Sequence, residues 1–332
     1  MKRLIFTLLV LTLLLTACQV TPLNEQEPPP YIDTGIDPEA WVTIPAGKFP
    51  YGQQSVIIDI DYDYEMMVTD VTVEQYAKFL NEVLASGEAT IGEVEIFADR
   101  GDISWTVEGV KGYYPGDHFD GYRHEEEVLP GDKIYIPLSD AKSDSYLDLL
   151  RLSQDGNTFT PIPGYENHPM TMVTWFGANA YCEYYGYRLP LEREWEKAFR
   201  GTEVNETGDG LPFPWGYEIH GNNANYYASS DPYEAMYGKL GSTTPVGFYN
   251  GKTYTLAGEK YETIDSASPY GLYDMAGNVW QWMGDDHHNQ HYRILRGGSF
   301  FTYEVDLRNW KENSVAPYHY DPDVGFRCAR SH

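Results

Sequence analysis

Apolar and polar residues alternate with helical spacing in the middle of the chain. Between residues 175 and 186, a stripe recurs at three- and four-residue intervals: Trp175, Ala178, Tyr181, Cys182 and Tyr185. The stripe predicts an amphipathic helix that Gly186 can end. Arg188-Leu189-Pro190 then favours an extended joint, because a residue before proline is pushed out of the helical region. A second helix is predicted over 192–200, with acids in its first turn, a base in its last, and Gly201 closing it.

The first part of the domain shows strand patterns followed by a third helix. An apolar run over 41–49 is broken at 45–47, and residues 56–60 alternate as a strand does. Thr72 followed by Gln75 is a capping-box pattern that starts a helix. Val73, Tyr76, Leu80 and Val83 would form its inner face.

The first residues of the chain predict an export signal. Residues 2 and 3 are basic, and the apolar run over 4–15 is too short for a comfortable membrane span. Leu15-Thr-Ala-Cys18 resembles a bacterial lipoprotein processing site, which predicts removal of residues 1–17 and a lipid anchor on Cys18. An acylated cysteine gives stable two-chain anchoring. The alternative is an ordinary secretory signal that contains a cysteine.

Composition excludes some functions and divides the chain. Residues 18–40, rich in proline and acids, predict a solvated tether ahead of a domain over 41–330. Aromatic content of 15% indicates a packed globule, and a net charge of −27 argues against nucleic acid as a partner.

Residues 86–165 carry many glycines, tyrosines and acids. We therefore predict a variable insertion of short strands and long loops. His118, Asp120, His124 and residues 125–127 form a cluster in it that is either a metal site or a solvated acidic loop. The loop is favoured because no ligand spacing is distinctive.

Several ordered motifs resemble one known family. They are Trp41-Val-x-Ile-Pro-Ala-Gly, Arg188-Leu-Pro-x-Glu-x-Glu-Trp, Phe213-Pro-Trp-Gly216, Gly271-Leu-Tyr-Asp-Met-Ala-Gly-Asn-Val-Trp, Arg296-Gly-Gly-Ser299 and Gly325-Phe-Arg-Cys328. In this order they resemble the sulfatase-modifying-factor family, whose best-known members are the formylglycine-generating enzymes. The resemblance implies an α+β fold related to C-type lectins, with a few helices, short strands and much ordered loop.

The same resemblance implies a disulfide between Cys182 and Cys328, the two cysteines left if Cys18 is lipidated. Export permits the bond. It would stabilise the fold by at most roughly 5 kcal/mol in the chain-entropy account. Two buried free thiols are the alternative.

The family's copper chemistry needs two further cysteines. In the aerobic formylglycine-generating enzymes, two thiols shortly after the Arg-Gly-Gly-Ser motif bind copper(I), which requires soft ligands. Thr302 and Leu307 stand at those positions here. We therefore expect no copper, and formylglycine generation by that mechanism is disfavoured.

Calcium is the cofactor that the resemblance leaves open. One site would use Asp274, the carbonyls of Gly277 and Val279, and Gln281, where family members usually have glutamate. A second would use Asn225 and the carbonyl of Tyr226, with Asp231 as a candidate acid. Alternatively, Asp274 and Asn278 only hold a loop turned by Gly277.

The last block predicts a groove for an extended peptide or a glycan. Its candidate residues are Arg296, Ser299, Arg308, Trp310, Tyr318, His319, Tyr320 and Arg327. The alternative is that at least two of the arginines pair with acids and hold loops together. Ser299, His319 and Asp323 could also be a hydrolytic triad, but such trios arise by chance.

Two functions remain after these steps. The first is a membrane-tethered extracytoplasmic binding or assembly module for an envelope protein or glycan. Because Gln19 is not the inner-membrane retention aspartate, its place would be the outer membrane in a double-membraned cell. The second is an oxidoreductase that modifies an exported protein through a cysteine-independent site. Fold analogy alone does not decide between them.

Overall fold

The computed structural model describes residues 29–97, 104–117, 128–140, 147, 149–227, 229–232, 242–256, 258–286 and 292–331. Within these ranges the fold is a mixture of α2 (Val73–Ser86), α4 (Trp175–Tyr184), α5 (Glu192–Arg200), a 3-10 turn η3 (Glu304–Leu307) and short strands joined by ordered loops. The predicted α+β class is confirmed.

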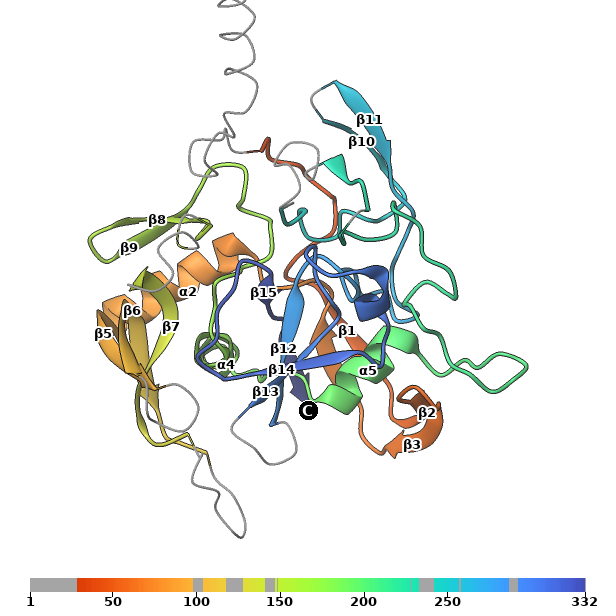
Figure 1. The fold of residues 1–332 in the computed structure, drawn as a ribbon, viewed down its shortest axis with the longest axis horizontal. Coiled ribbons are helices and arrows are strands. Elements are labelled where there is room, and N and C mark those ends of the chain that lie inside the picture. Colours follow the sequence, from red (N-terminus) through yellow and green to blue (C-terminus); the bar gives the residue numbers. More distant parts are fainter. Residues whose placement is uncertain are drawn as a thin grey trace, which may run out of the picture.

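The described strands form small separate sheets around the helices (Figure 1). The central one has the order β14 (Glu312–Val315), β13 (Arg293–Arg296), β12 (Trp280–Asp286) and β15 (Val324–Gly325), with only the β12–β15 pair parallel. A second holds β1 (Trp41–Ile44), β4 (Tyr64–Met67) and β16 (Ala329–Ser331). A third holds β5 (Ala89–Phe97), β6 (Ser104–Tyr114) and β7 (Gly131–Asp140). Three hairpins complete the set: β2 (Gly47–Tyr51) with β3 (Val56–Ile60), β8 (Leu152–Asp155) with β9 (Thr158–Pro161), and β10 (Thr253–Leu256) with β11 (Glu259–Glu262).

The three predicted helices are confirmed, and the second has the predicted bounds. At the start of α2, Thr72 Oγ1 accepts from the Gln75 backbone at 3.2 Å, and Gln75 Oε1 accepts from the Thr72 backbone at 2.9 Å. This is the predicted capping box, which satisfies two otherwise orphaned donors. Thr174 caps α4, and Gly186 follows its end with a φ of 77°.

The prediction of short strands in 86–165 is wrong for the third sheet, whose strands are 9, 11 and 10 residues long. Some of the glycines that suggested loops, among them Gly92, Gly109 and Gly112, lie inside these strands. A Cβ on Gly109 would come within 2.2 Å of the Ile136 carbonyl oxygen, and one on Gly112 within 2.1 Å of the Tyr135 hydroxyl. These glycines therefore permit close approach of neighbouring strands, a use of glycine that composition does not reveal.

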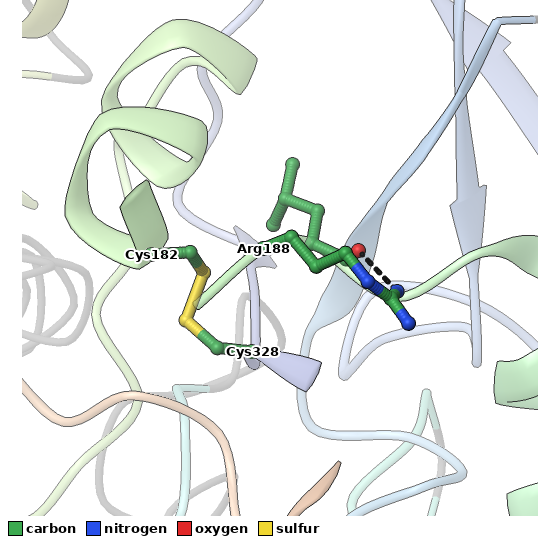
Figure 2. Close-up of a disulfide and its surroundings, with 4 residues drawn as sticks. Cys182, Arg188 and Cys328 are labelled. Carbon is green, nitrogen blue, oxygen red and sulfur yellow. Dashed lines mark hydrogen bonds between the residues drawn. A yellow bond between two sulfur atoms is a disulfide. The ribbon is translucent and has the colours of Figure 1, made fainter. Parts of the chain in front are cut away.

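A disulfide joins Cys182 in α4 to Cys328, which lies just before β16 (Figure 2). Both cysteines are fully buried among aromatic residues of the larger core, which α2 and α4 share with the central sheet. The bond closes a separation of 146 residues. The pairing is confirmed, and the alternative of two free thiols is wrong.

Residues 29–40, part of the predicted tether, contact the domain. The Thr34 hydroxyl is buried and donates to the Val246 carbonyl at 2.9 Å, and the Thr34 carbonyl accepts from Lys252 Nζ at 2.6 Å. Ile32 packs on the small cluster around Phe248. Part of this segment therefore packs against the domain, while Tyr31, Asp33 and Asp37 are exposed to solvent.

Some predictions concern residues outside the described ranges. They are the signal segment 1–17, the lipid anchor on Cys18 and the cluster from His118 to residue 127. In the part of the chain that the structure describes, no helix is both long and apolar enough to cross a membrane.

Candidate functional site

A cavity of about 700 Å³ opens beside the central sheet. The sheet, the turn after β13, the loop before β15 and the end of the insertion each contribute to its wall. The lining residues are Leu149, Arg151, Thr171, Ser242, Thr243, Trp280, Leu295, Phe300, Phe301, Asn313, Val315, His319, Asp321, Pro322, Asp323 and Val324. Half of these residues are apolar and half are polar or charged, so the wall combines apolar surface with polar groups that can orient a ligand.

Backbone hydrogen bonds fix the loop that carries Asp321 and Asp323 at the rim of the cavity. The Asp321 carbonyl accepts from Met172 at 3.1 Å, and the Asp323 carbonyl accepts from Trp280 at 2.8 Å. Val324 then pairs with Trp280 in the parallel β12–β15 ladder. Because the loop is fixed at two points, the carboxyl groups of Asp321 and Asp323 have defined positions.

Asp321 and Asp323 form a hydrogen-bonded carboxyl pair in this rim. Asp323 is 8% exposed, and the Ser299 hydroxyl donates to its Oδ2 at 2.5 Å. Burial raises the pKa of Asp321 to about 8, with the Asp323 carboxylate adding to the shift. Burial also raises the pKa of Asp323, against the hydrogen bond from Ser299. Like charges this close cannot both ionise freely, so the pair retains one proton near neutral pH.

His319 lies on the same wall, and burial lowers its pKa although the Asp323 carboxylate opposes the shift. The structure thus brings Ser299, His319 and Asp323 together. However, the Ser299 hydroxyl donates directly to Asp323, whereas in a hydrolytic triad the histidine stands between the hydroxyl and the acid. The arrangement is therefore not that of a serine nucleophile.

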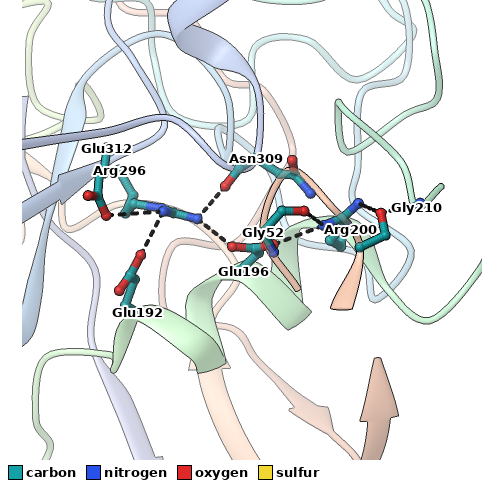
Figure 3. A network of polar contacts seen from close by, with 9 residues as sticks. Gly52, Glu192, Glu196, Arg200, Gly210, Arg296, Asn309 and Glu312 are labelled. Carbon is teal, nitrogen blue, oxygen red and sulfur yellow. Dashed lines mark hydrogen bonds and ion pairs between the residues drawn. The ribbon is translucent and has the colours of Figure 1, made fainter. Parts of the chain in front are cut away.

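The other predicted groove residues have different surroundings. Arg296 is buried at 1% exposure and pairs with Glu192 at 2.8 Å and Glu196 at 2.7 Å (Figure 3). Glu196 also pairs with Arg200 at 2.9 Å.

Arg327 is also buried, and its guanidinium lies 3.1 Å from an Asp70 carboxylate oxygen. Arg296 and Arg327 therefore confirm the alternative prediction that at least two of the arginines pair with acids. Arg308 lies over the ring of Trp310 at 5.7 Å, and neither residue lines the cavity.

Thr302 and Leu307, the two residues predicted to stand at the copper-ligand positions, have structural roles here. Thr302 Oγ1 accepts from the Ser299 backbone N–H at 2.9 Å and donates to the Ser299 carbonyl at 3.1 Å, which closes a turn. Leu307 is fully buried in the core around Trp195.

Gln281, predicted as a calcium ligand, is engaged elsewhere. Its Oε1 accepts from Trp195 Nε1 and from Arg327 Nε, both at 2.8 Å, and its Nε2 donates to the Asp274 carbonyl. Both lone pairs of the amide oxygen are used, so Gln281 does not fit a cation.

The remaining calcium candidates are hydrogen-bonded within their loops. Asp274 Oδ2 accepts from the Gly247 N–H at 2.6 Å, and burial raises the pKa of Asp274 to about 6. Asn278 bonds both backbone groups of Thr244, as the loop-holding alternative predicts.

At the second predicted site, the Asn225 carbonyl accepts from the Asn278 N–H, and the Tyr226 carbonyl accepts from Ser229. No group of three or more histidine, cysteine or acidic residues suited to a metal occurs among the described residues. Calcium at Asp274, Gly277, Val279, Asn225 and Tyr226 stays a prediction.

Sequence reasoning missed most of the cavity wall, including Arg151, Trp280, Phe300 and Asp321. The one available signal was Asp321-Pro-Asp323, two acids held apart by a proline directly before the Gly-Phe-Arg-Cys motif.

Comparisons with known proteins agree with this fold. The model of the sulfatase-modifying factor enzyme 1-like domain matches residues 33–332. The chain is 32% identical over 220 residues to serine/threonine-protein kinase pkn1 of Chlamydia caviae, covering 59% of this chain and 30% of the kinase. It is 31% identical over 168 residues to inactive C-alpha-formylglycine-generating enzyme 2 of Bos taurus, covering 48% of this chain and 50% of that protein.

Among solved structures, CarF has a TM-score of 0.50 at 18% identity, covering 88% of this chain and 98% of CarF. That likeness concerns the fold alone. The matched segments span half or less of the two curated relatives, whereas the family model matches nearly the whole described domain. The chain belongs to the family defined by the sulfatase-modifying factor enzyme 1-like domain.

Proposed function

We propose that this protein is a ligand-binding member of its family that does not carry out copper-dependent oxidation. The observation that carries the proposal is the use of the two cysteine positions: Thr302 closes a turn and Leu307 fills the core. Neither side chain supplies the soft thiolate that copper(I) needs. The relative named as an inactive formylglycine-generating enzyme offers a precedent within the family.

The proposed place of the protein is the outer face of a membrane, held by lipid on Cys18. Its partner would be an envelope protein or a glycan, bound in the cavity beside Ser299. That cavity offers aromatic walls and hydrogen-bonding groups, the combination that ligand sites use for affinity and orientation.

The test is metal analysis of the purified full chain, together with oxygen uptake on a peptide that carries the sulfatase cysteine motif. We expect no peptide-dependent oxygen uptake. Oxygen uptake by the double variant Thr302→Cys/Leu307→Cys, loaded with copper(I), tests whether residues 302 and 307 correspond to the copper-binding cysteines of the family. Copper or iron at one atom per chain in the unmodified protein, with peptide-dependent uptake, would overturn the proposal.

A further inference from the structure

We infer that the cavity binds a protonated amine of its ligand between Asp321 and Asp323. This inference rests on the proposed binding function and narrows its ligand class to amines carried by a peptide. Four features of the cavity lead to it.

The first feature is a carboxyl pair without a cation. Three other buried acids among the described residues have guanidinium partners: Glu194 pairs with Arg188 at 2.7 Å, Glu196 with Arg200 and Arg296, and Asp70 with Arg327 at 3.1 Å. Buried Asp274 instead accepts from a backbone N–H. No ion pair to a described arginine or lysine is present at Asp321 or Asp323. An ammonium group would supply the missing charge and hydrogen-bond donors.

The second feature is an unused hydroxyl. Ser242 lines the cavity at 3% exposure, and its Oγ has no hydrogen-bond partner among the described residues. A buried polar group without a partner costs free energy, which a ligand group can recover.

The third feature is the aromatic wall. Trp280, Phe300 and Phe301 line the cavity, and the two phenylalanine rings lie 4.3 Å apart. Aromatic faces attract cations and cover the apolar stem of an alkylamine. A lysine side chain combines both properties.

The fourth feature is the placement of the other charged groups in the described lining. Arg151 lies over the ring of Tyr165 at 4.2 Å. Burial lowers the pKa of His168 to about 3, and the Arg151 charge adds to that shift. Desolvation keeps His319 predominantly neutral. The charges acting on Asp321 come from Asp323, so this end of the cavity favours a cation.

Binding of an amine should displace a proton. The free pair retains one proton, and an ammonium group stabilises both carboxylates in their ionised form. Near pH 7, about one proton should leave the protein for each amine bound. This stoichiometry separates an ammonium from a neutral sugar or an amide, which would leave the proton in place.

The experiment is calorimetric titration of the full chain in detergent, in two buffers that differ in ionisation enthalpy. The probes are N-acetyl-lysine methylamide, its arginine counterpart and the neutral norleucine analogue. We expect the lysine probe to bind roughly tenfold or more tightly than norleucine, with proton release. Asp321→Asn should abolish the proton release and weaken binding of the lysine probe by a similar factor. Glu259→Gln, at an exposed position of β11, should change neither the proton release nor the affinity.

The outcomes separate this inference from the proposed function. Equal binding of lysine and norleucine probes, or unchanged proton release in Asp321→Asn, overturns the inference. Binding of N-acetylglucosamine in preference to any amine overturns it as well, but leaves the binding function standing. If glucosamine bound more tightly than the lysine probe, the ligand would be an amino sugar. That result would overturn the inference that a peptide carries the amine. Copper-dependent oxygen uptake would defeat the proposed function itself.

Discussion

Two groups of buried acids flank the central sheet, and they differ in how their charge is balanced. Glu196 has two guanidinium partners, Arg200 and Arg296, at 2.9 and 2.7 Å, and also accepts from the Gly52 backbone (Figure 3). Asp321 and Asp323 have each other, and Ser299. An acid whose charge is neutralised by arginines has a structural role, whereas the charge of a carboxyl pair beside a cavity can be neutralised by a bound proton or by a cationic ligand.

The largest effect is expected from Glu196→Gln. The substitution leaves two buried guanidinium groups without their shared carboxylate, which should cost about 3–5 kcal/mol of unfolding free energy. Denaturant unfolding measures the loss. Glu192→Gln is the matched control, because Arg296 would keep Glu196 and the Asn309 carbonyl. An equal loss of unfolding free energy in both variants would contradict the prediction that Glu196 contributes more to stability than Glu192.

Removal of the disulfide comes next. It ties the segment that carries Asp323 and Arg327 to α4, so Cys182→Ala/Cys328→Ala should cost about 2–5 kcal/mol. Molecules that stay folded should keep their amine affinity, since neither cysteine lines the cavity. Thermal unfolding with and without the lysine probe checks both parts. A variant of full stability but no affinity would show that the disulfide shapes the cavity.

A smaller effect is expected from pH. The folded-state pKa of Asp321, about 8, lies above its usual 3.8, so the folded protein binds more protons between these values. The contribution to stability is therefore present at low pH and declines as pH rises toward 8. Glu192, whose pKa burial raises to about 7, acts with the same sign. Comparison of the wild type with Asp321→Asn separates the contribution of the carboxyl pair from that of other groups. The unfolding free energy should change less between pH 5 and pH 8 in the variant than in the wild type.

The smallest effect is expected from Arg308→Ala. This residue is partly exposed and contacts the Trp310 ring, so its loss should cost about 0.5–1 kcal/mol. Amine affinity should not change, because Arg308 does not line the cavity. A clear loss of affinity in calorimetry would restore Arg308 to the binding surface.

Local patterns in the sequence were enough to predict the helices. The capping box at Thr72 and Gln75 and the stripe that begins at Trp175 involve residues three or four apart, where sequence and structure are directly linked. The long strands β5–β7 were missed because their glycines fit against side chains and carbonyls of neighbouring strands.

The cavity escaped prediction for a similar reason. Its wall joins Arg151, Trp280, Phe300 and Asp321, which long loops bring together from distant parts of the chain. Spacing along the sequence carries no record of such contacts. The resemblance to a family supplied the disulfide pair and the two altered cysteine positions. It also suggested Gln281 as a ligand, and burial of that amide against Trp195 and Arg327 decided otherwise.

The origin of the cavity wall has a consequence for how its ligand selection can be changed. Leu149 and Arg151 come from the end of the segment 86–165, while Trp280 and Asp323 come from the central sheet and the loop before β15. The Glu196 network and the disulfide lie wholly outside that segment. Substitution of Arg151 can therefore change the cavity wall while the Glu196 network and the disulfide stay intact. Substitution of Val110, Tyr135 or Ile136, from the same segment, would instead disturb the core that holds the disulfide.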